Sequence, residues 1–169
     1  MLTKSNGDTY EGETVNGKPH GKGKLTYYVN GTVYEGDFVN GEPHGKGKIT
    51  ENSVTFVEGE FVNGKMHGKG KIFGSDCQVE GDFVNFNIFI IGSNSPELFF
   101  YNLNFKGKIN TSNGQIECEF VNGKPHGKGK LTSPDGVLLF HGEPNGKVKL
   151  FKPDGRVEEF DWDWNDIIK

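Results

Sequence analysis

Four histidines recur in the same short sequence context, and metal binding is the first chemistry that such a repeated ligand could perform. Each is preceded by a proline or methionine and followed by a glycine: His20, His44, His67 and His126. If each copy sits on its own hairpin of a sheet, equivalent side chains are two strands, or roughly 9–10 Å, apart. A zinc ion holds its nitrogen ligands at ~2.0–2.1 Å, which excludes one ion shared between copies. We therefore expect no metal site and interpret these residues as loop histidines that hydrogen-bond the hairpin backbone; a fifth, His141, has no evident partner.

Neither the acidic residues nor the two cysteines form a recognisable catalytic arrangement. A catalytic carboxylate pair needs two environments that separate the two pKa values, whereas repeated units give every pair the same open environment. Cys77 and Cys118 are too few for a disulfide framework and have no histidine and acid beside them, so Cys118 is interpreted as a small packed side chain. The Gly-Lys-Gly-Lys segments lack the spacing of a phosphate-binding loop. We expect a protein that is not an enzyme, with no catalytic residue and no cofactor.

The composition favours a thin β structure. The chain has 169 residues, enough for one domain, and 33% of them are hydrophobic, against ~45–50% in an average protein. Glycine accounts for 26 residues and phenylalanine for 14, and the aromatic share of 12% argues against disorder. Nineteen basic and 23 acidic residues give a net charge of −4, which argues against a nucleic-acid partner. The first residues hold no apolar secretory segment, and no apolar run approaches ~18 residues, so we expect a soluble cytoplasmic protein.

An internal repeat organises the chain. Segments such as YEGDFVNGEPHGKGKI recur, and they begin at Tyr10, Tyr34, Val57, Val79, Ile116 and Phe140. Successive starts are 24, 23, 22, 37 and 24 residues apart. The long interval contains one insertion, at about 86–101, after which the repeat resumes at Phe105. We expect a single array over 1–169, with repeats near 10–33, 34–56, 57–78, 79–115, 116–139 and 140–157 and a C-terminal cap at about 158–169.

Each repeat has the pattern of a β-hairpin. Over 34–39 the residues alternate, with Tyr34, Gly36 and Phe38 on one face and charged residues or valine on the other. Turn signals separate successive repeats, namely Asn30-Gly31, Asn113-Gly114, Asp135-Gly136 and Asp154-Gly155. Within a repeat we expect a longer loop, which covers 40–45 in the second copy. Helical periodicity is absent, except for a possible last turn at the C-terminus.

Stacked hairpins place equivalent residues in columns on the two faces of the sheet. One face carries three apolar columns with glycines between them, and we expect aromatic rings to lie across the bare glycine backbone. The columns are Leu25, Ile49, Ile72, Ile109, Leu131 and Leu150; Tyr10, Tyr34, Val57, Val79, Ile116 and Phe140; and Phe38, Phe61, Phe83 and Phe120. The opposite face carries acidic residues on the first strands and lysines on the second strands. We expect cross-strand ion pairs there, each worth ~0.2–1 kcal/mol at most.

The repeated pattern Y-E-G-[E/D]-F-x-N-G-x-x-H-G-x-G resembles the MORN (membrane occupation and recognition nexus) repeat. Full-length copies begin at Tyr10, Tyr34, Val57 and Ile116. The sequence departs from the pattern where Cys118 replaces a glycine, where the fourth repeat lacks the His-Gly pair and where the sixth is truncated. The resemblance implies an all-β fold, an elongated single-layer antiparallel sheet of about six stacked hairpins with a short C-terminal cap. It also implies a scaffold or adaptor that binds proteins, often at cytoskeletal or membrane-associated structures, and in some members phosphoinositides.

Two segments depart from the repeat. The insertion, FNIFIIGSNSPELFFY, is strongly apolar and is typical of a longer hairpin that shields the apolar face, binds a partner, mediates self-association or enters a membrane. Its candidate surface residues are Ile88, Phe89, Phe99, Phe100 and Tyr101. The tail holds both tryptophans, and we expect an end cap formed by Trp162, Trp164 and Ile167, with a short linear binding motif as the alternative.

The leading hypothesis is a non-enzymatic protein-interaction scaffold. A single sheet would leave a large apolar face open, and we expect a partner helix or extended peptide to lie in a groove along it. The expected lining residues are Tyr10, Tyr27, Tyr34, Phe38, Phe61, Phe83 and Phe120. One alternative is peripheral binding of anionic lipids at the inner face of a membrane, which the charge of −4 and the interleaved carboxylates oppose. Others are a targeting module for a separate enzyme and homo-oligomerisation through the terminal strands.

Overall fold

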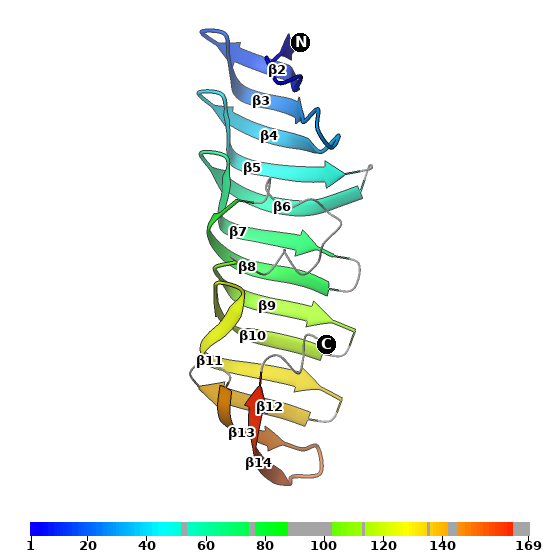
Figure 1. Cartoon of the computed structure of the whole chain (residues 1–169), viewed down its shortest axis with the longest axis vertical. Coiled ribbons are helices and arrows are strands. Elements are labelled where there is room, and N and C mark those ends of the chain that lie inside the picture. The colour runs from blue at the N-terminus through cyan, green and yellow to red at the C-terminus, as the bar shows by residue number, and fades with distance from the viewer. Residues whose placement is uncertain are drawn as a thin grey trace.

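In the computed structural model, the described residues form one antiparallel sheet of fourteen strands, each hydrogen-bonded to the next strand along the chain (Figure 1). It describes residues 1–51, 54–74, 77–87, 103–112, 114–134, 136–141 and 145–163, without the side chains of 54, 55, 77, 138–141, 145–147, 160, 162 and 163. The strands are β1 (Leu2–Thr3), β2 (Thr9–Val15), β3 (Lys18–Thr26), β4 (Val33–Val39), β5 (Glu42–Glu51), β6 (Val54–Val62), β7 (Lys65–Phe73), β8 (Cys77–Phe86), β9 (Phe105–Thr111), β10 (Gly114–Val121), β11 (Lys124–Ser133), β12 (Gly136–His141), β13 (Asn145–Phe151) and β14 (Val157–Asp163). Within these ranges there is no helix, and the expected all-β, elongated, single-layer sheet of hairpins is confirmed.

A two-residue Asn-Gly turn joins the two strands of a repeat. Between β4 and β5 the turn is Asn40-Gly41, with φ of 53° and 95°. Positive φ at both positions is the geometry of the tight hairpin turn that matches the twist of the flanking strands. The expected longer loop over 40–45 is therefore wrong, because the residues after the turn pair at once, Glu42 with Val39 and Pro43 with Phe38.

A β-bulge follows this turn and bends the hairpin. Between the pairs Phe38↔Pro43 and Gly36↔Gly47, three residues of β5 face the single Asp37 of β4. Gly45 lies in this stretch with φ of 68°, a conformation that glycine adopts without steric cost. Bulges increase bending and twist, and the turn ends of the hairpins curl out of the plane of the sheet on the left of Figure 1.

Backbone hydrogen bonds connect the turn of one repeat to the preceding repeat. The Gly41 N–H donates to the Pro19 carbonyl at 2.9 Å, and the Gly64 N–H donates to the Pro43 carbonyl at 2.9 Å. After the insertion Leu103 takes the place of the proline, and its carbonyl accepts from Gly123 at 2.9 Å. The curled ends therefore stack on one another along the array.

The connections between repeats lie along the other side of the sheet (Figure 1). The expected turn signals Asn30-Gly31 and Asp154-Gly155 are in them, and the Gly31 N–H donates to the Tyr27 carbonyl at 2.9 Å. Of the other two expected turns, Asn113 and Asp135 lie outside the described residues, and each following glycine begins a strand. Tyr27 follows the end of β3 and belongs to a connection.

The core lies on one face of the sheet, where the expected columns meet. Leu25, Ile49 and Ile72 of the second strands and Val57 and Val79 of the first strands are at most 1% exposed. The expected packing of rings on glycine is confirmed in the first two repeats. A Cβ atom on Gly23 would overlap the ring of Tyr10, and one on Gly47 would overlap the ring of Tyr34.

The expected cap at 158–169 is described only as far as residue 163 and stays a prediction. Residues 158–163 belong to β14, which pairs with β13 along its whole length, from Phe151↔Val157 to Asn145↔Asp163. This part of the tail extends the sheet and does not close it. Trp162 is on β14, its side chain is not described, and Trp164 and Ile167 lie outside the described residues.

Candidate interaction surfaces

The aromatic residues that we expected to line a groove lie in the core. Six of them are at most 1% exposed: Tyr10, Tyr34, Phe38, Phe61, Phe83 and Phe120. Tyr34 packs edge-to-face on Phe38 and on Phe61, with ring centroids 5.2 Å and 5.1 Å apart. The expectation of an open groove is wrong for these six side chains, because the folded sheet leaves each of them at most 1% exposed. Tyr27 is partly buried against the same core.

The tyrosine hydroxyls are used within the fold. The Tyr10 hydroxyl donates to the Glu13 carbonyl at 2.7 Å, and the Tyr34 hydroxyl donates to the Asp37 carbonyl at 3.1 Å. Both carbonyls belong to the strand that faces the bulge. Burial raises the pKa of both tyrosines above the ordinary value of 10.0. These residues therefore bend and hold the hairpin and offer no free hydroxyl chemistry.

Met66 replaces a tyrosine ring in the third repeat. Val57 stands where the first two repeats have tyrosine, and Met66 stands where they have Pro19 and Pro43. The Met66 side chain is fully buried, and its Cε lies above the backbone of Gly59 and Gly70. A flexible thioether side chain suits such an irregular space. The two substitutions therefore compensate each other.

Cys118 is a packed side chain, as expected. It is 6% exposed and pairs in register with Gly107. Burial, the largest cause, raises the pKa of its thiol to about 12, although a hydrogen bond from the His126 backbone opposes the shift. A thiol with this pKa stays protonated at neutral pH and is a poor nucleophile. The side chain of Cys77 is not described.

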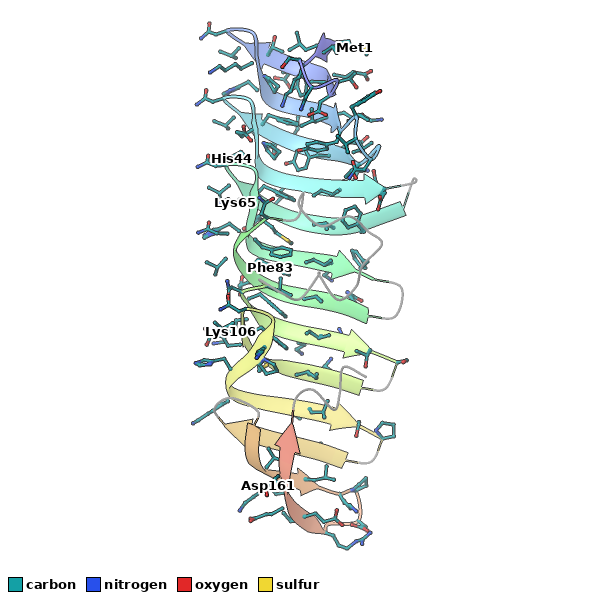
Figure 2. All side chains as sticks on the ribbon, in the orientation of Figure 1. Met1, His44, Lys65, Phe83, Lys106 and Asp161 are labelled. Atoms are coloured by element: carbon teal, nitrogen blue, oxygen red, sulfur yellow. The ribbon has the colours of Figure 1, made fainter. Side chains whose placement is uncertain are left out.

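The recurring histidines lie in strands β3, β5, β7 and β11. The expectation that they are loop residues is therefore wrong. His44 is on the turn side of the array (Figure 2), and its buried Nδ1 has no hydrogen-bond partner. The expected bond to the hairpin backbone is therefore not made by that nitrogen. In the part of the chain that the structure describes, no three His, Cys, Asp or Glu side chains gather where they could hold a metal ion.

The outer face, opposite the core, carries the expected charges. Lys48 Nζ lies 2.9 Å and Lys24 Nζ 3.8 Å from the carboxylate of Glu35, so one acid bridges the lysines of both neighbouring strands. The hydrogen bond from Lys48 is the main cause that lowers the pKa of Glu35. Equivalent ion pairs confirm the predicted cross-strand pairing elsewhere: Lys22–Asp37, Lys69–Asp82, Lys71–Glu80 and Lys108–Glu117.

Open depressions lie between the charged residues of the outer face, and two of them are lined by described residues alone. The larger has a volume of 520 Å³ and is lined by Glu35, Lys46, Gly47, Lys48, Glu58, Gly59, Glu60 and Lys69. The second, of 380 Å³, adjoins it over β6, β7 and β8 and shares Glu58, Gly59 and Lys69. Both are shallow troughs over bare glycine backbone with walls of alternating charge. They offer charge complementarity to a partner and no enclosed space for a small molecule.

A row of exposed valines, which we missed in the sequence, runs along the turn side of the outer face. The valine row consists of Val15, Val39, Val62, Val84 and Val121, which are 37–54% exposed. Each precedes an asparagine with φ between 48° and 53°. Alternation puts these valines on the face of the charged residues, and their recurrence before Asn was the signal that could have found them. Successive members are two strands, or roughly 9–10 Å, apart where no insertion intervenes.

The expected insertion surface stays a prediction. Its residues, Ile88, Phe89, Phe99, Phe100 and Tyr101, lie outside the described residues. Leu103, which follows these residues in the sequence, is fully buried and belongs to the core. Over the ranges that the structure describes, no helix has the length and apolar character needed to cross a membrane.

A family model, the MORN repeat, matches four segments, at residues 10–32, 34–50, 58–76 and 119–137. No curated protein matches the sequence. MORN repeats are generally modules for protein or membrane interaction, and the family is a non-enzymatic repeat module. Three matched segments fall on the successive hairpins β2–β3, β4–β5 and β6–β7, and the fourth falls on β10 and β11 of the same sheet, so the chain contains MORN repeats.

Proposed function

We propose that this protein is a non-enzymatic scaffold that binds a partner protein along its outer face. The observation that supports this is the valine row, whose five side chains remain 37–54% exposed although the core is fully packed. Removing apolar surface from water is favourable by ~25 cal/mol for each Å², and folding leaves the surface of these valines in contact with water. A partner that covers the row would gain this free energy.

The charged rows beside the valines would select among partners. Lysines and carboxylates alternate from strand to strand, roughly every 4.8 Å along the array. A partner surface whose alternating charges lie opposite charges of the other sign adds favourable ion pairs. A partner surface with a single sign of charge meets as much repulsion as attraction. The proposed contact is therefore an elongated element, apolar at its centre and of mixed charge at its rim.

The experiment is affinity capture with a charged substitution in the valine row. The double variant Val39→Glu, Val62→Glu should lose the partner, since it buries two carboxylates in the contact. Val29→Glu, Val157→Glu is the matched control, because these valines are also exposed, at 91% and 52%, and lie outside the row. Circular dichroism checks that both variants fold.

The captured protein must then be purified and titrated against both variants by calorimetry. Affinity that falls at least about tenfold for the row variant and stays unchanged for the control supports the proposal. Equal affinity for the two variants would overturn it. In that case the insertion becomes the next surface to delete.

Anionic lipid is the alternative ligand. Lysines of the outer face are exposed, Lys69 at 83% and Lys22 at 72%, but carboxylates lie within 4 Å of both. Membrane attraction scales with unneutralised basic charge, which the ion pairs and the net charge of −4 reduce. Flotation with vesicles that contain phosphoinositide, at low and at physiological salt, tests it. Co-flotation that survives physiological salt would favour the lipid over a protein partner.

A further inference from the structure

The two depressions described on the outer face are continuous with each other. The larger extends from Glu35 of β4 to Lys69 of β7, and the smaller extends from Glu58 of β6 to Asp82 of β8. Together they form one trough across the adjacent strands β4–β8 (Figure 1), roughly 19 Å long at ~4.8 Å between strands. We call it the glycine trough, after the residues of its floor: Gly47, Gly59, Gly70 and Gly81.

The glycine trough is narrow. Its walls are two rows of charged side chains, which on β6 are Glu58 on one side of Gly59 and Glu60 on the other. Residues two apart on a strand are separated by roughly 6.6–6.8 Å. An α-helix with its side chains is ~10–12 Å wide and does not fit between the rows, whereas an extended backbone, which occupies ~4.8 Å in a sheet, does.

The floor of the trough offers no backbone hydrogen bonds to a partner. Strands β5, β6 and β7 are each hydrogen-bonded to a neighbouring strand on both sides, so their N–H and C=O groups are used within the sheet. A segment in β conformation that crosses these strands therefore gains no ladder. A polyproline II segment needs none, because its backbone has no internal hydrogen bonds and remains hydrated.

The repeat distance of the array matches the period of a polyproline II helix. Equivalent charges recur on every second strand, roughly 9.6 Å apart, as from Glu35 to Glu58 to Glu80. In a polyproline II helix every third residue lies on the same side, at intervals of ~9.3 Å. Residues on one side of a β-strand recur every ~6.6–6.8 Å, and the nearest match in an α-helix is seven residues, or ~10.5 Å. Polyproline II side chains therefore stay in phase with the charges from one repeat to the next.

Three charges in the larger depression have no ion-pair partner. The ion pairs of β5 and β7 are directed away from β6, to β4 and to β8. Among the described residues, Lys46, Glu58 and Glu60 form no ion pair. All three line this depression. A bound segment therefore gains most from a basic residue above β6 and an acidic residue above β5.

We propose that the glycine trough binds a polyproline II segment of a partner protein in which a proline, a basic residue and an acidic residue each recur at every third position. The prolines lie over the glycines, the basic residues pair with the acidic strands and the acidic residues pair with the lysine strands. Six residues of polyproline II are ~18.6 Å long, close to the roughly 19 Å of the trough. The trough lies beside the valine row, and this contact is independent of the one proposed above.

The probe is a regular peptide, acetylated and amidated Pro-Lys-Glu-Pro-Lys-Glu-Pro-Lys-Glu, titrated into the isotope-labelled protein and followed by NMR. We expect the amide signals of Gly47, Gly59 and Gly70, on the floor of the trough, to shift. Shifts confined to residues outside the trough, or no binding up to about 1 mM peptide, would overturn the proposal.

Two further peptides test the period and the backbone conformation. The irregular peptide Pro-Lys-Pro-Lys-Glu-Glu-Pro-Lys-Glu has the same composition, but its lysines follow one another at intervals of two and four residues. In the third peptide alanine replaces each proline, which favours an α-helix. Each should bind at least about tenfold more weakly than the regular peptide. Equal or tighter binding of either one would overturn the proposal.

Charge substitutions locate the contact. The variant Glu58→Lys, Glu60→Lys should bind the regular peptide at least about tenfold more weakly, because it places lysines opposite the basic residues of the peptide. The matched control, Glu42→Lys, Glu158→Lys, makes the same charge change at exposed positions outside the trough and should keep the affinity. Circular dichroism checks that both variants fold. An equal loss of affinity in the two variants would overturn the proposal.

The valine-row variant separates this contact from the one proposed above. Val39→Glu, Val62→Glu leaves the lining of the trough intact and should bind the regular peptide within about twofold of the wild-type affinity. Its loss of the captured partner is thus a result separate from peptide binding. A tenfold weaker affinity of this variant for the peptide would place the peptide on the valine row and overturn the proposal.

Discussion

Tyr34 illustrates how a single residue type shapes this protein. Its ring covers the bare backbone of Gly47 and packs edge-to-face with two phenylalanines, and its hydroxyl donates to the Asp37 carbonyl at the bulge. Ring and glycine thus form a core from one layer of strands, without a second sheet or helix. The same residue is buried and neutral, and we therefore expect the protein to lose stability at alkaline pH.

We expect the free energy of unfolding to fall as the pH rises above about 10. Burial raises the pKa of Tyr34 in the folded state, while in the unfolded chain it stays near its ordinary value of 10.0. The folded protein therefore keeps a proton that the unfolded chain releases. The contribution is fully present below about pH 10 and is lost as the pH rises toward the folded-state pKa.

Urea unfolding of Tyr34→Phe at several pH values between about 8 and about 11 measures this effect. The variant loses about 1 kcal/mol near pH 8 with the hydroxyl hydrogen bond, and its stability should then depend less on alkaline pH than that of the wild type. Tyr28→Phe is the control, since Tyr28 is 74% exposed. Parallel curves for Tyr34→Phe and the wild type would contradict the prediction.

At the scale of the element, the hairpin combines a tight turn with a bulge. Asn40 and Gly41 close the turn with positive φ, and Gly45 allows three residues to face one. The bend that follows encloses Phe38 and Pro43 against the core. The third repeat reaches the same shape with Met66 and Val57 in place of proline and tyrosine, so the pair should behave as one unit.

A double-mutant cycle tests this unit. Met66→Pro alone should destabilise the protein by about 2–3 kcal/mol, because it empties the space above Gly59 and Gly70. Val57→Tyr alone should cost about 1–3 kcal/mol by overpacking against Met66. The double variant recreates the combination of Tyr34 and Pro43 and should recover at least about 1 kcal/mol of the summed loss in urea unfolding. Strictly additive losses would contradict the compensation.

At the scale of the whole molecule, interior strands and end strands differ in the number of strands to which they are hydrogen-bonded. Each interior strand is hydrogen-bonded on both sides, and the curled turns are tied from repeat to repeat. The two end strands of full length, β2 and β14, have one full-length neighbour each among the described residues. Such arrays derive their stability from each unit and its contacts with adjacent units.

Hydrogen exchange followed by mass spectrometry should show a gradient of amide protection that decreases from the interior strands to the end strands. Amides in β4–β7 are expected to exchange slowest, and those in β2 and β14 faster, because opening an end strand breaks one interface and opening an interior strand breaks two. Protection of β14 equal to that of β6 in the wild type would contradict the gradient.

The sequence by itself determined the repeat, the hairpins, the apolar columns, the packing of rings on glycine and the alternating ion pairs. These features depend on alternation along a strand and on register between neighbouring copies, both of which are readable from spacing. It also placed Cys118 correctly as a packed side chain. The valine row was present in the sequence too, before each Asn, although only its exposure drew attention to it.

Only the tertiary structure decided which face is available to a partner. Phe38 and Tyr34 have the same alternation whether the face above them is open or enclosed, and in the folded sheet, where the hairpin bends at Gly45, both are at most 1% exposed. That bend depends on which residues pair after Asn40-Gly41, and hydrophobic pattern alone does not reveal it. The ion pairs of Lys22 and Lys24 were likewise decided by the folded sheet, because each lysine has an acidic strand on both sides and both pair with β4.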